Sequence, residues 1–149
     1  MQQSERGVNL EQGEAITLLA SAARGATAGT NGTAVEVHGE RMVYTWILNV
    51  TAAATDVTDT LDVYIDTLFG TATWINAAHF TQVLGNGGAV AYFTTTMPAG
   101  MTTTDAVATD CAAGVGRGVV GSQFRARYVI VDPGAGAASF TFSLTGYAL

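Results

Sequence analysis

The segment that most constrains the fold is residues 61–96, in which short alternating runs are separated by turn residues. In residues 61–66, Leu, Val and Ile alternate with Asp and Tyr. Successive side chains of a β-strand point to opposite faces of the sheet, so this period of two predicts a half-buried strand. Two further strands are expected at residues 73–84 and 89–93. The pattern is typical of a β-rich domain that works through its surface, because the segment contains no catalytic motif.

A turn signal joins the last two of these strands. Residues 85–88 are Gly-Asn-Gly-Gly, and the strand-like run 89–93 follows them directly. Asn and Gly adopt the positive φ angles that a short hairpin turn requires. We therefore expect residues 73–84 and 89–93 to pair as a β-hairpin.

Composition supports an all-β fold and excludes several functions. Threonine and the 18 glycines favour strands and turns, whereas lysine is absent. Six arginines against twelve carboxylates leave a net charge of -6, which does not suit electrostatic binding to nucleic acid. One cysteine excludes an internal disulfide. Residues 1–14 lack the apolar run of a secretory signal, and no run is long enough to span a membrane.

One domain accounts for the chain. We expect residues 1–13 to form an N-terminal arm, and residues 14–149 to form an antiparallel β-sandwich, jelly-roll-like, of about eight strands. A long loop is expected at residues 97–121. The remaining strands are expected at residues 15–23, 34–38, 41–53, 122–132 and 139–149.

Inward-facing positions of these strands predict the core, which comprises Trp46, Leu48, Val63, Ile65, Phe124, Tyr128, Phe140 and Phe142. The buried indole N–H of Trp46 is expected to find a nearby acceptor. The alternation falters at Ala77-Ala78, and this predicts a β-bulge that redirects His79 and Phe80.

Paired carboxylates are the best candidates for chemistry. Asp62 and Asp66 lie on the outer face of one expected strand, with their Cα atoms roughly 13 Å apart, which is too far for a glycosidase pair or for chelating one ion. We interpret them as a solvated face, laddered against Arg125 and Arg127 on a neighbouring strand. A weaker alternative is a calcium site, which Asp56 and Asp59 can join from the loop before this strand. The spacing of an EF-hand loop is missing, however.

Two other motifs are weak. Residues 116–121 read G-x-G-x-x-G, but a strand rather than a helix is expected to follow, which argues against a dinucleotide site. We interpret the glycines as a flexible loop that presents Arg117 to a partner. A triad of Cys111 or Ser122 with His79 has no supporting nucleophile motif.

Several phrases of the sequence resemble a group of small virion proteins from tailed bacteriophages. These are residues 16–24, residues 62–67 with the following Trp74, residues 79–88 and residues 124–128. The resemblance implies a β-sandwich found in the virion, such as a capsid decoration (cement) protein, a minor head protein, or a neck or tail component. It supplies no functional residues that can be transferred to this chain.

The expected function is therefore that of a non-enzymatic capsid decoration protein on the outer head surface, made in the host cytoplasm and bridging major capsid subunits. We expect a homo-oligomer, with a trimer favoured, and no cofactor, metal, nucleic acid or membrane partner. The alternatives are a neck, tail or fibre component, or a carbohydrate-binding module in which Trp74 contacts a glycan, although core packing of Trp74 is the favoured interpretation. The candidate interface residues are Leu10, Glu11, Met97, Met101, Arg117 and Val119.

Overall fold

The computed structural model describes residues 14–36, 43–86, 91–98, 121–134 and 136–148. Within these ranges it contains ten β-strands and no helix. The strands are β1 (Glu14–Gly25), β2 (Thr27–Asn31), β3 (Val35–Glu36), β4 (Val43–Ala52), β5 (Thr60–Phe69), β6 (Thr73–His79), β7 (Val83–Leu84), β8 (Ala91–Pro98), β9 (Gln123–Val131) and β10 (Ser139–Ala148).

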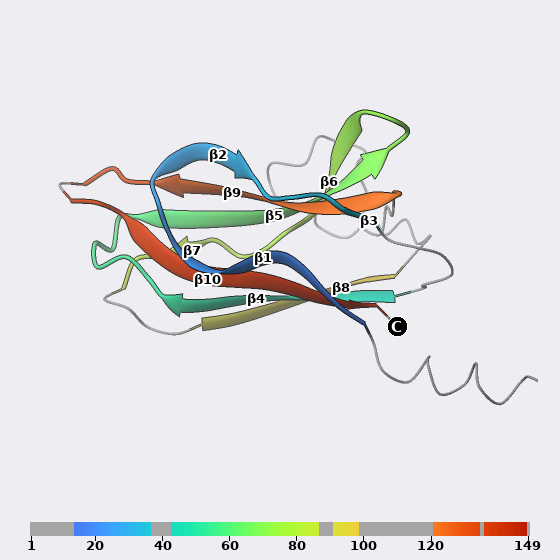
Figure 1. The fold of residues 1–149 in the computed structure, drawn as a ribbon. Helices are drawn as coiled ribbons and strands as arrows, with labels where there is room; N and C mark the ends of the chain where they lie inside the picture. Colours follow the sequence, from blue (N-terminus) through green and yellow to red (C-terminus); the bar gives the residue numbers. More distant parts are fainter. Residues whose placement is uncertain (1–13, 37–42, 87–90, 99–120, 135, 149) are drawn as a thin grey trace, which may run out of the picture.

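Two antiparallel sheets face each other as a sandwich (Figure 1). One sheet has the order β1-β10-β4-β8, and the other has the order β2-β9-β5-β6, with the two-residue strands β3 and β7 added beside β9 and β5. The eight longer strands pair in nested fashion: β1 with β10, β2 with β9, β4 with β8, and β5 with β6. This nesting, in which the chain folds back along its own length, is a jelly roll. The expected fold class is confirmed.

The core lies between the sheets and follows from strand alternation. On β4, alternate residues from Tyr44 to Val50 are buried, and the residues between them are partly exposed. β4 is a central strand between β10 and β8, as the apolar residues on both of its faces indicate. Seven of the eight predicted core residues are buried, whereas Tyr128 is only partly buried at the margin. The indole Nε1 of Trp46 has no hydrogen-bond partner in the described part of the chain, so the expected acceptor is absent there.

The predicted hairpin at residues 84–93 is wrong. β7 pairs with β5 in one sheet, whereas β8 pairs with β4 in the other. The chain therefore crosses between the sheets after Asn86, through residues 87–90, which lie outside the described ranges. The predicted loop also begins later than expected, because β8 continues through Met97 to Pro98.

The irregularities of two strands have local causes. Pairing of β5 with β6 shifts so that Ala77 is extra, which confirms the predicted bulge and leaves Phe80 buried. Two similar shifts in β1 bury Leu19 as well as Leu18, which simple alternation did not predict. The Arg24 guanidinium caps the second shift by donating to the carbonyl oxygens of Ala20, Ala22 and Phe142 at 2.7–2.9 Å.

Gly146 of β10 lies directly against the indole of Trp46 on β4. A Cβ atom at Gly146 would lie 2.3 Å from two indole carbons, and Trp46 is fully buried and cannot move aside. Gly146→Ala is expected to lower the free energy of unfolding by about 1–3 kcal/mol through overpacking. Chemical denaturation of parent and variant measures this.

Gly136→Ala is the matched control, because a Cβ there would meet no atom within 4 Å. It is expected to change stability by less than about 0.5 kcal/mol. Equal stabilities for the two variants would contradict the close packing of Gly146 on Trp46.

Candidate functional site

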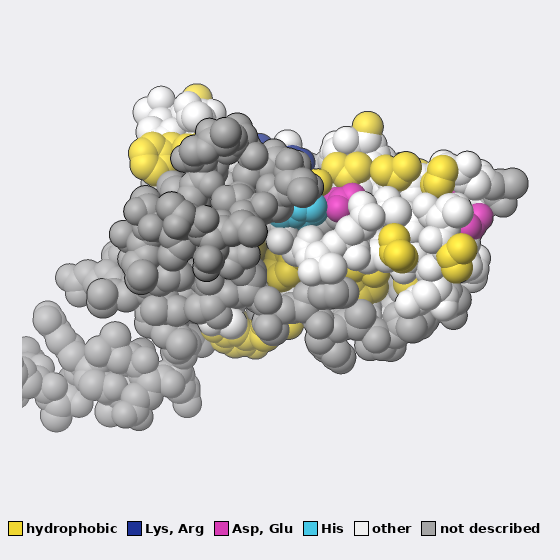
Figure 2. All heavy atoms as spheres, turned by 180° about the vertical axis from the view of Figure 1, so that it is seen from behind, with side chains coloured by type: hydrophobic (Ala, Val, Ile, Leu, Met, Phe, Trp, Pro, Cys, Tyr) yellow, Lys and Arg dark blue, Asp and Glu magenta, His cyan; other side chains and the backbone are white. Residues whose placement is uncertain are grey.

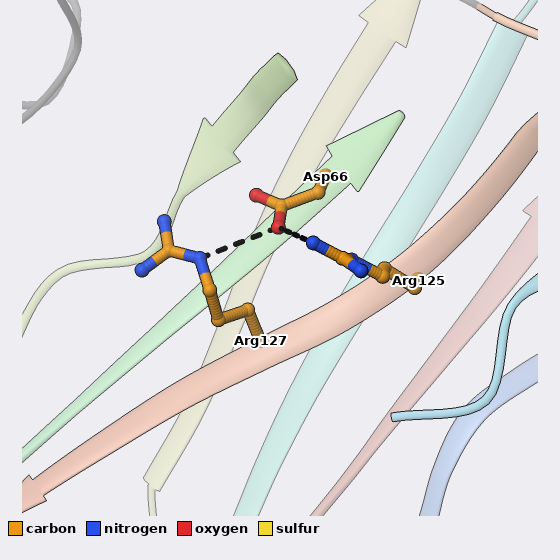
Figure 3. A network of polar contacts seen from close by, with 3 residues as sticks. All are labelled: Asp66, Arg125 and Arg127. Atoms are coloured by element: carbon orange, nitrogen blue, oxygen red, sulfur yellow. Dashed lines mark hydrogen bonds and ion pairs between the residues drawn. The ribbon is translucent and has the colours of Figure 1, made fainter. Parts of the chain in front are cut away.

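The outer face of the β2-β9-β5-β6 sheet carries a network of charged and aromatic side chains. At its centre is Asp66 of β5, which is only 4% exposed although it points away from the core. Its Oδ2 atom accepts hydrogen bonds from Arg125 Nη2 at 3.4 Å and from Arg127 Nε at 3.3 Å. Figure 3 shows the two guanidinium groups, both from β9, approaching this oxygen from different directions. One carboxylate thus holds two arginines.

Aromatic rings fix the orientation of both arginines. The guanidinium carbon of Arg125 lies 4.1 Å from the ring centroid of Trp74, and that of Arg127 lies 3.9 Å from the ring centroid of Tyr64. Tyr64 also stacks on His79, with ring centroids 4.1 Å apart. Because Arg127 and His79 lie on the strands flanking β5, they occupy opposite faces of the Tyr64 ring. Tyr64 therefore has no open face for stacking on a sugar.

His79 continues the network to Asp62. Its Nε2 atom lies 3.1 Å from Asp62 Oδ1, while Gln82 Nε2 donates to Asp62 Oδ2 at 2.9 Å. In Figure 2 the cyan histidine surface adjoins a magenta carboxylate surface. Alternation in the sequence does not predict this pair, although the bulge at Ala77, which sets the side of His79, is a usable signal. The predicted ladder is confirmed for Asp66 and wrong for Asp62, whose partners lie on the β6 side of the sheet. The expectation that Asp66 is solvated is wrong, because the side chains around it leave it only 4% exposed.

The opposite end of the same sheet is acidic. Asp56 and Asp59 lie between β4 and β5, and Asp132 directly follows β9. Thr58 donates to Asp56 Oδ1 from its backbone N–H at 2.9 Å and from its hydroxyl at 2.8 Å, and these bonds lower the pKa of Asp56. Burial, followed by repulsion from Asp132 and Asp56, raises the pKa of Asp59. Asp59 is 3% exposed, and its Oδ1 has no hydrogen-bond partner among the described residues.

Trp74 is the one candidate contact residue whose side chain the structure describes. It is half-buried on the outer face of the sheet, so the favoured expectation of core packing is wrong. Met97 lies in β8, where its backbone is paired with Tyr44 of β4. The remaining candidates lie outside the described ranges, as does Cys111; they are Leu10, Glu11, Met101, Arg117 and Val119.

Neither predicted alternative chemistry gains support from the described residues. In these ranges no group of three or more His, Cys, Asp or Glu side chains is placed to hold a metal ion, and this includes Asp56 and Asp59. The backbone N–H of Ser122 donates to the carbonyl oxygen of Leu68. Leu68 lies four residues along β5 from Tyr64, which pairs with His79. That spacing corresponds to roughly 13 Å, too far for a Ser122–His79 pair. Within the described segments, no helix could cross a membrane.

Comparisons with protein-family models, with curated proteins and with solved structures found no match to this chain. The chemistry of the site therefore has to be judged from its own geometry. That geometry combines oriented guanidinium groups, aromatic rings and an acidic end, which together favour recognition through charge and stacking.

Replacing Asp59 is expected to change how stability depends on pH. A pKa raised in the folded state means that Asp59 opposes folding once it ionises, so its contribution to stability is lost as pH rises from about 4 through its folded-state pKa. Asp59→Asn is expected to raise the melting temperature at neutral pH. It is also expected to reduce the loss of stability that accompanies rising pH. Thermal melts across the acidic and neutral range measure both effects.

Asp56→Asn provides a control of opposite sign. Because the pKa of Asp56 is lowered in the folded state, its carboxylate stabilises the fold at pH values above the usual aspartate pKa, and this stabilisation is lost as pH falls. The substitution is expected to lower the melting temperature at neutral pH. Melting temperatures that shift in the same direction for both variants would contradict the destabilising effect of ionised Asp59.

Proposed function

We propose that this chain is a non-enzymatic structural protein of a tailed-bacteriophage virion, and specifically a capsid decoration protein on the outer head surface. The observation that carries the proposal is the jelly roll of two opposed sheets, an architecture that occurs in viral capsid domains. Lectins and cupins share this architecture, so the fold alone assigns no function. The surface and the sequence resemblance to small phage virion proteins supply the rest.

Surface chemistry supports a binding role on the outside of a particle. The net charge of -6 would repel packaged DNA, which is itself a polyanion. Large apolar side chains remain exposed in the described part of the chain, among them Val57, Phe69, Leu84 and Val131. Arginine and tryptophan are stacked on the outer face of one sheet, and these residue types often dominate binding energy at protein interfaces.

In this proposal the partner is the major capsid protein, which the chain bridges as a homo-oligomer. Bridging adjacent subunits would stabilise the head against internal pressure without any chemical reaction. The competing structural role is that of a neck, tail or fibre component. A glycan-binding role for Trp74 has less support, because Arg125 occupies one of the two ring faces on which a sugar could stack.

Copy number tests the proposal and separates the two structural roles. Quantitative mass spectrometry of purified virions is expected to find this chain at near-equal numbers with the major capsid protein. Purified protein added to heads that lack it is expected to rebind and to raise their resistance to heat. A dozen or fewer copies per particle would identify a neck or tail component instead, and absence from the virion would contradict the proposal entirely.

Removal of residues 1–13 tests how the protein attaches. The first described backbone pair is Glu14 with Ala148, so the deletion removes no described strand. The segment has little apolar content to contribute to the core. We expect an unchanged melting temperature and loss of head binding, measured by co-sedimentation with heads. Full binding by the truncated protein would remove the arm from the attachment mechanism.

A further inference from the structure

Two arginines share one carboxylate on the outer face of the β2-β9-β5-β6 sheet. Of the three arginines in the described ranges, Arg24 donates to backbone carbonyl oxygens, and Arg125 and Arg127 share the single carboxylate of Asp66. Arg125, Arg127 and Asp66 together carry a charge of +1, whereas Asp62, further along the same face, is held by His79 and Gln82. Two guanidinium groups on one carboxylate leave most of their N–H donors available.

The guanidinium N–H donors of Arg125 and Arg127 are held in fixed positions, and several of them have no hydrogen-bond acceptor among the described residues. Arg125 Nε is buried without a hydrogen-bond partner, and in the described part of the chain Asp66 is the only hydrogen-bond partner of either guanidinium group. The side chains of Arg125 and Arg127 remain 20% and 30% exposed. The terminal nitrogens of Arg127 point away from Asp66 (Figure 3). Stacking on Trp74 and Tyr64 holds the guanidinium groups in place, which lowers the entropy cost of binding a further carboxylate.

The chain carries a complementary surface at its other end. Connections β4–β5 and β9–β10 lie together at one end of the sandwich, and the β5–β6 turn lies at the opposite end (Figure 1). The first end holds Asp56, Asp59 and Asp132. Burial of Asp59, followed by repulsion from Asp132 and Asp56, raises the pKa of Asp59. Asp59 Oδ1, in a side chain that is 97% buried, lacks a hydrogen-bond partner among the described residues.

Apolar side chains adjoin this acidic end. Leu84 and Val131 both pair with Thr60, one from each side, and are 53% and 47% exposed. Val57, between the two β4–β5 carboxylates in sequence, is 67% exposed. Excess negative charge and exposed apolar groups at this end are complementary to a surface that carries cationic and aromatic side chains.

We infer that the Trp74–Arg125–Arg127 surface of one copy binds the acidic end of a second copy of this chain. The partly exposed carboxylates of Asp56 and Asp132 make the contact, and the buried Asp59 adds its negative charge. Two different surfaces meet in such a contact, so the association is head-to-tail and closes into a ring when the rotation permits. The inference rests on the homo-oligomer part of the proposed function and identifies the surfaces through which the copies associate.

Val57 allows the acidic end to be tested without disturbing the fold, because its side chain is largely exposed. Val57→Arg reduces the negative charge there and is expected to weaken self-association about tenfold, whereas Val57→Glu is expected to strengthen it. Sedimentation velocity of the purified full chain measures the dissociation constant at low and high salt. Association of the parent should weaken at high salt, because exposed charges are screened.

Charge exchange between the two surfaces tests their pairing. Arg127→Glu is expected to weaken self-association at least as much as Val57→Arg, and an equimolar mixture of the two variants is expected to associate better than either alone. Thermal melts establish that each variant is folded, and Arg127→Gln replaces Arg127→Glu if the latter is not. Equal effects of Val57→Arg and Val57→Glu, or no recovery in the mixture, would overturn the inference.

The same experiments separate this inference from the proposed function. A parent protein that is monomeric in solution but occupies phage heads fully would overturn the head-to-tail contact and leave the decoration role intact. A protein that self-associates as described but does not bind heads would support the contact and contradict the decoration role.

Discussion

Aromatic packing between the two sheets is the interaction on which the rest of the structure depends. Tyr44 and Trp46 of β4 both contact Phe124 of β9, each with ring centroids 5.1 Å apart. At another point, Phe142 of β10 contacts Tyr128 of β9 at 5.4 Å. Buried aromatic side chains contribute large apolar areas and favour edge-to-face contacts such as these. They fix the separation and the orientation of the sheets.

That packing also determines what the outer face presents. Because Phe124 and Ala126 of β9 point inward, Arg125 and Arg127 must point outward. The same alternation on β5 turns Asp62, Tyr64 and Asp66 to the outer face, where antiparallel register aligns them with side chains of β9 and β6. The charged and aromatic network is thus a direct consequence of how the core is filled.

A rigid sandwich of this kind separates unlike surfaces along one molecule. The acidic and apolar region lies beside the beginning of β5, and the paired arginines of β9 lie beside Tyr64 and Asp66, further along β5. Strand geometry holds these regions apart, so neither can neutralise the other within a single copy. A second molecule can bring them together, which is how the electrostatics of one fold can favour ordered assembly.

Sequence alone determined the fold class, most of the core and the inward faces of β4, β5, β9 and β10, because alternation is a local property of consecutive residues. It also located the bulge at Ala77. It did not determine the pairing of β7 and β8 with different sheets, since an Asn-Gly turn signal carries no information about which distant strand is the partner. The His79–Asp62 pair was decided by the register of β6 on β5, which the bulge shifts, and the contact of Trp74 with Arg125 depends on bringing β9 beside β5. Long-range pairing depends on the whole core closing at once, and only the tertiary structure records that outcome.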